Sequence, residues 1–324
     1  GVIVESKVED NKVINPENSI EVIDMLEYKE VVKYSSKGEH VKELQRVLKD
    51  LGYYHDSIDG IAGKNTVLAI KIFQQDYSLA VDGIAGRQTY NMINEVLNTG
   101  KRPNNNYKIL RPDIQTTVVQ IPHEQIKLID VIVANTKNGR ETLSNMQKRT
   151  NCDFIINGGF YWTDEKSVSH SLNLLIDEYK QQQAGVYSRF GLRTFKDNKY
   201  EFDWYKWSPE LKDMLGGSPS LVINGEINID GKPSGNITTA RHPRTAIGMD
   251  DSHFYLVTID GRRASQGLKG MTVDELAKFM LGLGCKNAIN LDGGGSTRLM
   301  HKQTVLNKPL ENRPVNNAVG IKLR

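Results

Sequence analysis

Cysteine is scarce in this chain, and long apolar runs are missing. Its 324 residues include two cysteines, Cys152 and Cys285, too few for a disulfide scaffold or a cysteine-rich zinc site. Each precedes an apolar segment that leads to a glycine pair or triplet, so the two could lie side by side in one sheet. Two separate buried thiols are the alternative, because free cysteine packs as a small hydrophobe. No apolar run approaches the roughly 20 residues of a membrane span.

Metal-ligand clusters and an initiator Met are also lacking. The seven histidines are scattered along the chain, so we predict no metal site of the histidine or cysteine kind. The residues require no cofactor, and a divalent cation, Ca²⁺ or Mg²⁺, on Asp292 or Asp260 is left open. The chain starts at Gly1, and we expect that an export signal has been removed before it.

Charge is unevenly distributed, although the net value is only +3. Residues 1–36 carry four basic against eight acidic residues, and residues 37–98 carry seven against eight. Residues 99–324 carry 31 basic and 23 acidic residues, a net charge of +8. This basic excess suits an anionic ligand in the C-terminal two thirds. Lysines spread over a solvated face would give the same sum.

A near-repeat marks a small helical domain at residues 37–98. The sequence DGIAG occurs at 59–63 and again at 82–86, and apolar residues three and four apart predict a helix before, between and after the copies. Residues 1–36 show no clean period and are interpreted as a tail or connector. Residues 99–115 contain two prolines and a run of asparagines, which is typical of a linker.

The spacing of this helical segment resembles the peptidoglycan-binding three-helix domain of bacterial and phage wall hydrolases. The pattern includes a Leu-Gln pair in the first predicted helix, then LGY, then two copies of DG-x-x-G-x-x-T. The resemblance implies docking on peptidoglycan, and a helical bundle without a ligand is the alternative. The residues assigned to that contact are Gln45, Tyr53, Asp59 and Asp82.

Residues 116–324 have the pattern of a sheet with few helices. Short runs rich in β-branched residues alternate with turns, and Asn224-Gly225 predicts a two-residue hairpin. Thr272 and Glu275 form a Thr-x-x-Glu capping box before an apolar helical run. We therefore predict a multi-domain chain: a small all-α domain followed by an α+β domain on a mixed, mainly antiparallel β-sheet.

Several predicted strands of this domain end in polar and glycine residues. The strand before residues 290–297 runs into NLDGGGST, whose glycines could expose backbone N–H groups to phosphate or sugar oxygens. A structural corner is the alternative for that stretch alone. A second strand ends in Asn157-Gly158-Gly159, and Arg244 and Arg262 stand at two further strand ends. Arginine binds phosphate in a bidentate manner, so these ends indicate one anion-binding pocket.

Five motifs in order resemble the phosphodiester glycosidase family. They are NGGFY at 157–161, PRTAIG at 243–248, DGR at 260–262, NLDGGGST at 290–297 and ENRPVNNA at 311–318. Tyr161 replaces a usual Phe, and the polar stretch 163–215 has no traceable counterpart in the family. The resemblance implies cleavage of the C1–O bond between a sugar, typically N-acetylglucosamine, and a phosphodiester.

The roles that follow for these residues combine the family's reaction with their chemistry. A carboxylate near C1 would stabilise an oxocarbenium-like carbon as nucleophile or as base toward water, and the candidates are Asp292 and Asp260. Phosphate and sugar would be held by arginine and backbone groups. The residues predicted to bind substrate are Asn157, Gly158, Gly159, Arg244, Arg262, Asn290, Gly293, Gly294, Gly295, Ser296, Thr297 and Arg313.

The fusion of the two domains predicts a wall polymer as substrate and partner. We expect an extracellular, wall-associated enzyme that contacts peptidoglycan and an anionic glycopolymer, with neither nucleic acid nor a membrane span involved. The linkage between teichoic acid and peptidoglycan has the bond type that the family cleaves. Two alternatives are a phosphodiesterase that cleaves the P–O bond and a wall protein that only binds a glycan.

Overall fold

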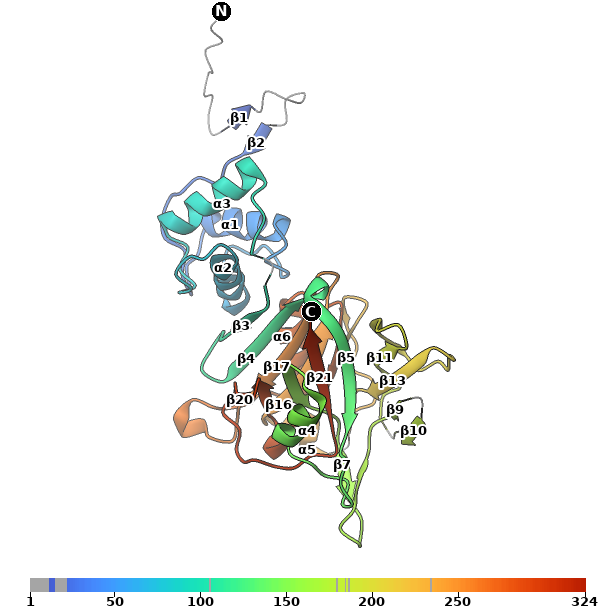
Figure 1. The fold of residues 1–324 in the computed structure, drawn as a ribbon. Helices are drawn as coiled ribbons and strands as arrows, with labels where there is room; N and C mark the ends of the chain where they lie inside the picture. Colours follow the sequence, from blue (N-terminus) through green and yellow to red (C-terminus); the bar gives the residue numbers. More distant parts are fainter. Residues whose placement is uncertain are drawn as a thin grey trace, which may run out of the picture. The chain divides into compact units, whose positions relative to one another are not determined.

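The chain divides into two compact units, Gly1–Asn105 and Asn106–Arg324, here called the helical unit and the β unit (Figure 1). The computed structural model describes residues 12–14, 22–104, 106–178, 180–183, 185, 187–233 and 235–324. Among these residues, no helix has the length and apolar character needed to cross a membrane. Most of the predicted tail, residues 1–11 and 15–21, lies outside the described residues.

The helical unit contains the three predicted helices. They are α1 (Glu39–Asp50), α2 (Lys64–Asp76) and α3 (Arg87–Thr99), and a short hairpin of β1 (Lys12–Ile14) and β2 (Val22–Asp24) precedes them. Each helix begins directly after a glycine, and the side chains at three- and four-residue spacing form one buried core. That core contains Val41, Leu44, Leu48, Ile70, Phe73, Tyr90 and Ile93.

Residues 26–33 pack into the helical unit, which the interpretation of 1–36 as a tail or connector did not include. Leu26 and Val32 are buried in the helical core. The Leu26 backbone exchanges hydrogen bonds of 2.8 and 2.9 Å with the Asn94 side chain. Tyr28 packs against the same core, with its ring 5.1 Å from that of Tyr90. The segment has no helical or strand period of its own, because it is ordered by these contacts with the helices.

The repeated DGIAG segments build two equivalent turns around buried glutamines. Gln45 Nε2 donates to Asp59 Oδ1 at 3.0 Å and to Thr66 Oγ1 at 3.1 Å, and Gln45 Oε1 accepts from the Gly60 backbone. Gln74 makes the same three contacts with Asp82, Thr89 and Gly83. The repeat is therefore a structural device that ties each turn to the preceding helix.

Gln45 has no exposed surface, so the prediction that it contacts peptidoglycan is wrong. Its amide is enclosed because it satisfies the polar backbone of the turn. Asp59 and Asp82 lie at exposed positions, although one carboxylate oxygen of each is used in its turn. Tyr53 is partly exposed and donates to Asp76 at 2.6 Å. A contact between these three residues and peptidoglycan stays a prediction.

Replacing Gln45 by alanine should destabilise the helical unit selectively. The change leaves the buried Gly60 N–H and Thr66 hydroxyl without their partner, at an expected cost of about 2–4 kcal/mol. Calorimetry of the full chain should show one unfolding transition shifted downward, with the transition of the β unit unchanged. Gln75→Ala, one residue beyond the equivalent glutamine, is the control. Equal shifts in the two variants would contradict the structural role of Gln45.

The β unit is built from antiparallel sheets. A seven-stranded sheet has the order β15-β14-β18-β16-β17-β4-β3, and two five-stranded sheets have the orders β20-β19-β6-β21-β5 and β10-β9-β13-β11-β12. The strands of the first sheet are β3 (Lys108–Leu110), β4 (Thr116–Pro122), β14 (Ser220–Ile223), β15 (Glu226–Ile227), β16 (Arg244–Met249), β17 (His253–Ile259) and β18 (Asn287–Asn290).

The other sheets complete the β unit. The second sheet has β5 (Ile126–Val133), β6 (Phe154–Asn157), β19 (Leu299–His301), β20 (Thr304–Val305) and β21 (Asn317–Leu323). The third has β9 (Leu175–Asp177), β10 (Lys180–Gln183), β11 (Phe190–Phe195), β12 (Tyr200–Trp204) and β13 (Leu211–Gly216). A separate hairpin pairs β7 (Tyr161–Thr163) with β8 (Ser169–Ser171).

Few helices accompany these sheets, as the sequence predicts. They are α4 (Leu143–Thr150), α5 (Asn236–Thr239) and α6 (Val273–Gly282), with short 3₁₀ turns at His123–Gln125, Ala264–Gln266 and Gly294–Ser296. The predicted capping box of Thr272 and Glu275 is present at the start of α6. Every strand pairing among the described residues is antiparallel.

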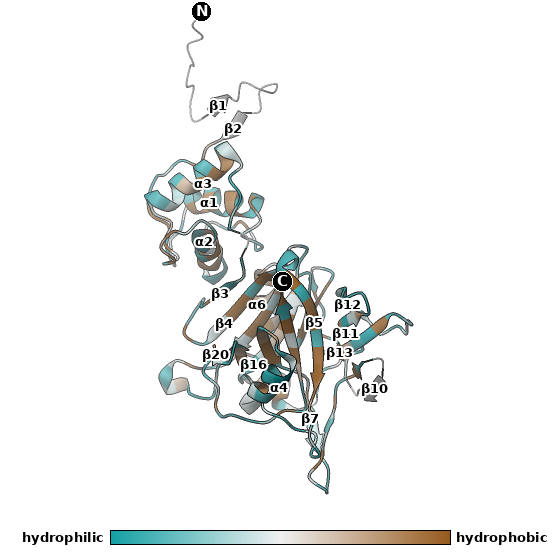
Figure 2. Cartoon of the chain, viewed as in Figure 1, coloured by the Kyte–Doolittle hydropathy of each residue, from teal (hydrophilic) through white to brown (hydrophobic). Residues whose placement is uncertain are grey.

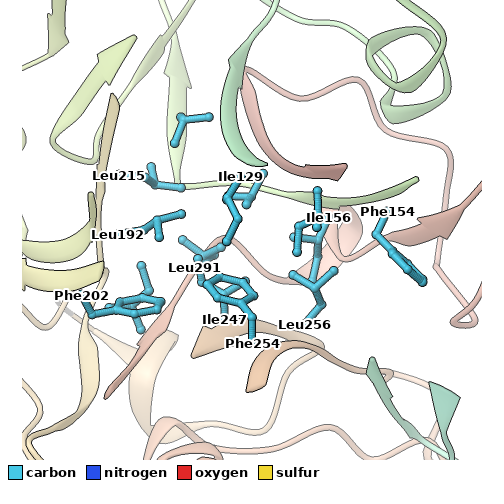
Figure 3. Packing of buried hydrophobic residues seen from close by; sticks show 14 of the residues in the cluster. Ile129, Phe154, Ile156, Leu192, Phe202, Leu215, Ile247, Phe254, Leu256 and Leu291 are labelled. Atoms are coloured by element: carbon cyan, nitrogen blue, oxygen red, sulfur yellow. The ribbon is translucent and has the colours of Figure 1, made fainter. Parts of the chain in front are cut away.

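One apolar core joins the three large sheets. Side chains from β5, β6, β11, β12, β13, β16 and β17 point toward one another in Figure 3, which labels Ile129, Phe154, Ile156, Leu192, Phe202, Leu215, Ile247, Phe254 and Leu256. In Figure 2 the strands β4 and β5 are largely brown, which marks hydrophobic residues, whereas the helix α4 is mainly teal, which marks hydrophilic ones. Burial of this core fixes where each strand ends, and thus where the polar residues after the strands lie.

The structure contains the hairpin turn that the sequence predicts in the β unit, but the linker ends earlier than predicted. Asn224 and Gly225 have φ values of 52° and 81° and connect β14 to β15 as predicted.

Both cysteines are free and buried. The predicted linker 99–115 is shorter in the structure, because β3 pairs with β4 and already belongs to the sheet. A three-residue edge strand after an asparagine run gives too weak a pattern to detect.

Candidate active site

The five sequence motifs meet at one edge of the two larger sheets. Asn290 pairs with Ala246 and Ala318 pairs with Asn157, which aligns the ends of β18, β16, β21 and β6. The Asp292 N–H donates to the Gly158 carbonyl at 2.9 Å, and the Gly294 N–H donates to the Pro243 carbonyl at 3.1 Å. Strands that are far apart in the sequence therefore present their polar ends together.

Asn157 is the internal support of this edge. It has no exposed surface, and its Nδ2 donates to the Asp292 carbonyl at 2.8 Å. Its Oδ1 accepts from Thr245 Oγ1 at 2.9 Å and from the Arg298 N–H at 3.1 Å. The prediction that Asn157 binds substrate is wrong, because the side chain is enclosed and already bonded at both ends.

The backbone N–H groups of the two glycines after Asn157 also form hydrogen bonds inside the protein. The Gly158 and Gly159 N–H groups donate to the Asn317 carbonyl at 2.9 Å and to its Oδ1 at 2.7 Å. A Cβ on Gly158 would overlap Asn317, and one on Gly159 would overlap Asn173. The prediction that these N–H groups bind a ligand is therefore wrong. Glycine is needed here so that two asparagine side chains can approach the backbone.

The glycine triplet 293–295 acts in a similar way. The Gly293 N–H donates to Asp292 Oδ1 at 2.9 Å, and the Gly294 N–H is used by Pro243. The N–H groups of Ser296 and Thr297 donate within the loop itself. The predicted cradle of free N–H groups is thus wrong for Gly293, Gly294, Ser296 and Thr297. Ligand binding by the Gly295 N–H stays a prediction. What the triplet provides is space for the arginine side chains that face it.

Two guanidinium groups lie against the glycine triplet. A Cβ on Gly294 would lie 3.0 Å from Arg262 Nη1, and one on Gly295 would lie 2.5 Å from Arg313 Nη2. Arg313 forms an ion pair with Glu311. Arg262 has a φ of 58°, and a left-handed conformation in a bulky residue stores strain that is typical of functional sites. The triplet therefore places two positive groups beside Asp292.

Asp292 combines the features of a catalytic carboxylate. Burial raises the pKa of Asp292 to about 6, against the opposing effects of the Ser296 hydroxyl, the Gly293 N–H and the arginines Arg313 and Arg262. A carboxyl group with a pKa near neutrality can exchange protons under working conditions or attack as the anion. Asp292 is partly exposed to solvent, so a substrate can reach its carboxyl group.

Arg244 contributes a buried positive charge behind this edge. Its Nε and Nη2 donate to the Met271 and Ala240 carbonyls, each at 2.8 Å. Burial, followed by the charge of Arg262, lowers the pKa of Arg244 to about 10. No ion pair joins Arg244 or Arg262 to a carboxylate among the described residues. An unbalanced pair of guanidinium groups favours an anionic ligand at this edge.

Asp260 is engaged in holding a neighbouring loop. Its Oδ1 accepts from Asn307 Nδ2 at 2.9 Å, and both of its oxygens accept from the Lys308 N–H at 3.1 and 3.0 Å. Burial raises the pKa of Asp260, and these hydrogen bonds oppose the rise. The geometry gives Asp260 a positioning role, and its catalytic role stays a prediction.

The remaining predicted residues line the interior of the same edge. Asn290, Ser296 and Thr297 are each at most 2% exposed. Asn290 Nδ2 donates to the Ser218 carbonyl at 2.6 Å, and the Thr297 hydroxyl accepts from Thr245 at 3.4 Å. Among the described residues, neither Asn290 Oδ1 nor Ser296 Oγ, both buried, has a hydrogen-bond partner of normal geometry. Of these groups, the Ser296 hydroxyl acts on Asp292, because it favours the ionised form of that carboxyl group and lowers its pKa.

Two tyrosines near Asp292, Tyr161 and Tyr187, are site residues that the sequence motifs do not predict. Burial, and after it the Asp292 charge, raises the pKa of both Tyr161 and Tyr187. Tyr161 OH donates to the Pro314 carbonyl at 3.0 Å, and the Tyr187 ring packs edge-on against Phe160. Tyr161 could have been found from its motif, whereas Tyr187 lies in the stretch 163–215 and carries no local signal.

Replacing Gly295 by alanine should weaken substrate binding and spare the fold. The new methyl group overlaps the Glu311 and Arg313 side chains, whose flexible ends can move aside, so we expect KM to rise roughly tenfold through loss of one charged contact. Steady-state kinetics and a thermal melt measure the two effects. Gly293→Ala should instead lower the melting temperature, because its methyl group meets the Pro243 backbone carbonyl. A KM unchanged in Gly295→Ala would contradict the placement of Arg313.

Matches to known families cover both units of the chain. Residues 150–322 match the phosphodiester glycosidase family, and residues 37–93 match a peptidoglycan binding domain. The match to the phosphodiester glycosidase family lies within the β unit. The chain belongs to the phosphodiester glycosidase family, because that match covers more than half of its length.

Similar proteins come from animals and bacteria. The chain is 27% identical over 192 residues to the human N-acetylglucosamine-1-phosphodiester alpha-N-acetylglucosaminidase, a match that covers 52% of this chain and 36% of the relative. It is 40% identical over 171 residues to the SPbeta prophage-derived protein YomE of Bacillus subtilis, covering 49% and 26%. A spore cortex-lytic enzyme of Oceanobacillus iheyensis is 36% identical over 72 residues, covering 22% and 26%. The chain thus spans about a quarter to a third of these relatives.

A solved structure supports the fold. The catalytic domain of the zebrafish N-acetylglucosamine-1-phosphodiester alpha-N-acetylglucosaminidase superposes with a TM-score of 0.54 at 20% identity, covering 67% of this chain and 82% of that one. A hypothetical protein from Synechocystis gives a TM-score of 0.53 at 16% identity, covering 67% and 61%. These likenesses confirm the predicted β architecture.

Proposed function

We propose that the β unit hydrolyses the C1–O bond of a sugar 1-phosphodiester, with N-acetylglucosamine as the sugar. The observation that carries this proposal is a carboxylate with a pKa of about 6 beside two guanidinium groups. Arg262 has no carboxylate partner among the described residues, and Arg313 pairs with Glu311. Phosphate is a good leaving group, so the site needs to hold its charge and stabilise the carbon rather than protonate it. Family membership supports the same reaction.

In the proposed reaction the C1–O bond to phosphate breaks, and a water oxygen ends bonded to C1, either directly or after a carboxylate oxygen has held C1 in a covalent intermediate. The phosphate monoester leaves with the electron pair of that bond, and Arg262 and Arg313 neutralise its developing charge. Asp292 supplies negative charge at C1, either as a nucleophile or by taking the proton of the attacking water. The buried Arg244 increases the positive potential behind the phosphate.

The substrate class follows from the second unit. A peptidoglycan-binding domain on the same chain favours a wall-associated enzyme, and the basic excess of residues 99–324 favours an anionic polymer. The relatives named as spore cortex-lytic enzymes match about a fifth of this chain. We propose the linkage between an anionic glycopolymer, such as teichoic acid, and peptidoglycan as the bond that is cleaved.

Purified walls and isotopic water test the proposal. Incubation of the full chain with walls in ¹⁸O-water should release phosphomonoesters and sugars whose new hydroxyl at C1 carries the label. Label in the phosphate would instead identify a phosphodiesterase. Wall binding without any product from walls or from a soluble sugar 1-phosphodiester would identify a binding protein, and either result would reject the glycosidase assignment.

Removal of divalent cations should leave turnover unchanged. The charges that act most strongly on Asp292 are those of Arg313 and Arg262, and the described residues contain no group of three metal-ligating side chains. Turnover after extensive dialysis against EDTA is the measurement. A loss that Ca²⁺ or Mg²⁺ restores would assign a cation to Asp292 or Asp260 and contradict the proposed charge balance.

A further inference from the structure

Four lysines converge on a cavity that the proposed reaction does not use. The cavity has a volume of about 580 Å³ and lies between β5, α4, β21 and the turn between β19 and β20. These elements can be followed in Figure 1. Each contributes one lysine to the lining: Lys127, Lys148, Lys322 and Lys302.

Few carboxylates of the protein neutralise the positive charge of this lysine cavity. None of its four lysines forms an ion pair among the described residues. The single carboxylate in the lining belongs to Asp153, and its Oδ2 accepts the Leu323 N–H at 2.8 Å. Like charges held around one concave surface repel one another and raise the local concentration of anions.

The turn that carries Lys302 is held in a costly conformation. Lys302 and Gln303 have φ values of 43° and 71°, a region that residues other than glycine rarely adopt. The Lys302 N–H donates to the Asp153 carbonyl at 3.0 Å, and the Gln303 N–H and Nε2 each donate to Gln147 Oε1 at 2.9 Å. Gln147 is buried and also donates to the Asp153 carbonyl. The lysine cavity is therefore preformed on its turn side.

The lysine cavity lies at the opposite end of the second sheet from Asp292. Asp153 precedes β6, whereas Gly158 follows β6 and accepts the Asp292 N–H. Five residues of extended chain separate the two ends by about 16 Å. That distance exceeds one sugar phosphate unit, so a ligand that uses both places must be a polymer.

We propose that the lysine cavity is a second binding site, for phosphate groups of an anionic phosphodiester polymer. The identity of the polymer rests on the proposed function, since the same class of chain would present its terminal linkage to Asp292. Lysine binds phosphate as a point charge and tolerates varied geometry, which suits a flexible polymer. A second weak contact on one chain raises the overall affinity by increasing the effective concentration of the first.

The test uses the full chain carrying Asp292→Asn, so that the polymer is not consumed, and poly(glycerol phosphate) as the probe. The test variant changes the cavity residues to glutamine: Lys127, Lys148, Lys302 and Lys322. The control variant makes the same change at exposed lysines elsewhere on the β unit: Lys137, Lys206, Lys232 and Lys278. Both lose four positive charges, so a difference between them reports position and not net charge.

The test variant should bind the polymer at least tenfold more weakly at low salt, while the control stays within twofold of the parent. The slope of log Kd against log salt should fall by about 3 in the test variant, since each lysine–phosphate contact contributes somewhat under one unit. Equal affinities of the two variants would overturn the proposal. Equally tight binding of single-stranded DNA of matched charge by the parent would also overturn it, because that marks a general polyanion surface.

A second measurement separates this proposal from the proposed function. With Asp292 intact, the lysine variant should hydrolyse a soluble monomeric sugar 1-phosphodiester with unchanged kcat/KM and a wall polymer with a raised KM. An equal loss on both substrates would contradict a separate polymer site. Absence of turnover in the parent enzyme would reject the proposed function and leave the binding comparison as the decisive test of the cavity.

Discussion

Asp292→Asn should abolish hydrolysis of a sugar 1-phosphodiester, with kcat reduced by roughly 10³-fold or more. Asparagine has the same shape but can neither attack C1 as an anion nor take a proton from water. In the parent enzyme, burial raises the pKa of Asp292 to about 6. The rate should therefore fall as the pH drops through about 6, because the active anionic form is lost there. A pH profile of kcat/KM measures this.

The same substitution should leave the β unit intact or make it more stable. The folded protein keeps the Asp292 proton to a higher pH than the unfolded chain does, so ionisation disfavours the fold. This destabilisation appears as the pH rises from about 4 to about 6 and persists above it. A melting temperature at pH 7 that is unchanged or higher would show that turnover is lost because the carboxylate is missing and not because the protein unfolds. Turnover retained above one tenth of the parent rate would remove Asp292 from the mechanism.

Asn157→Ala should destabilise the β unit by about 2–5 kcal/mol and also lower turnover. The change removes the partner of the Arg298 N–H, the Thr245 hydroxyl and the Asp292 carbonyl, and it leaves these polar groups buried. Because Asn157 fixes the backbone of Asp292, we expect the position of the carboxylate to shift as well.

Calorimetry of the full chain distinguishes this effect from general loosening. The transition of the β unit should move downward, while the transition assigned to the helical unit by Gln45→Ala stays in place. Asn145→Ala on the surface of α4 is the matched control, since that residue is exposed. Parent-like stability together with parent-like turnover would contradict the role of Asn157 as a support.

Short-range patterns predicted the elements of this protein well. The helices around the DGIAG repeats, the Asn224-Gly225 hairpin and the capping box at Thr272 depend on neighbouring residues, and the structure contains each of them. The prediction of a mainly antiparallel β domain is also confirmed, but the expected mixture with parallel pairs is wrong for the described residues, whose strand pairs are all antiparallel. The two boundary errors, at residues 26–33 and 106–115, both involve short segments that are ordered by distant partners.

The direction of each polar side chain was harder to predict. The sequence pattern favours Asn157 and Gln45 as contacts for substrate and peptidoglycan, yet both side chains are enclosed. A polar residue beside glycine in a sequence can face a ligand or satisfy a buried backbone, and the local pattern is the same in both cases. Only the packing of other strands decides between them, as Asn317 and Thr245 do for the segment 157–159.

The sequence by itself determined that a carboxylate, a glycine triplet and several arginines stand at strand ends, in an order that the phosphodiester glycosidases share. The tertiary structure decided what the glycines do, which is to admit Arg262 and Arg313 to the backbone beside Asp292. It also brought four lysines from separate elements to one cavity. Sequence patterns record neighbours along the chain, whereas a pKa near 6 and a charged cavity depend on groups that meet only when the sheets pack.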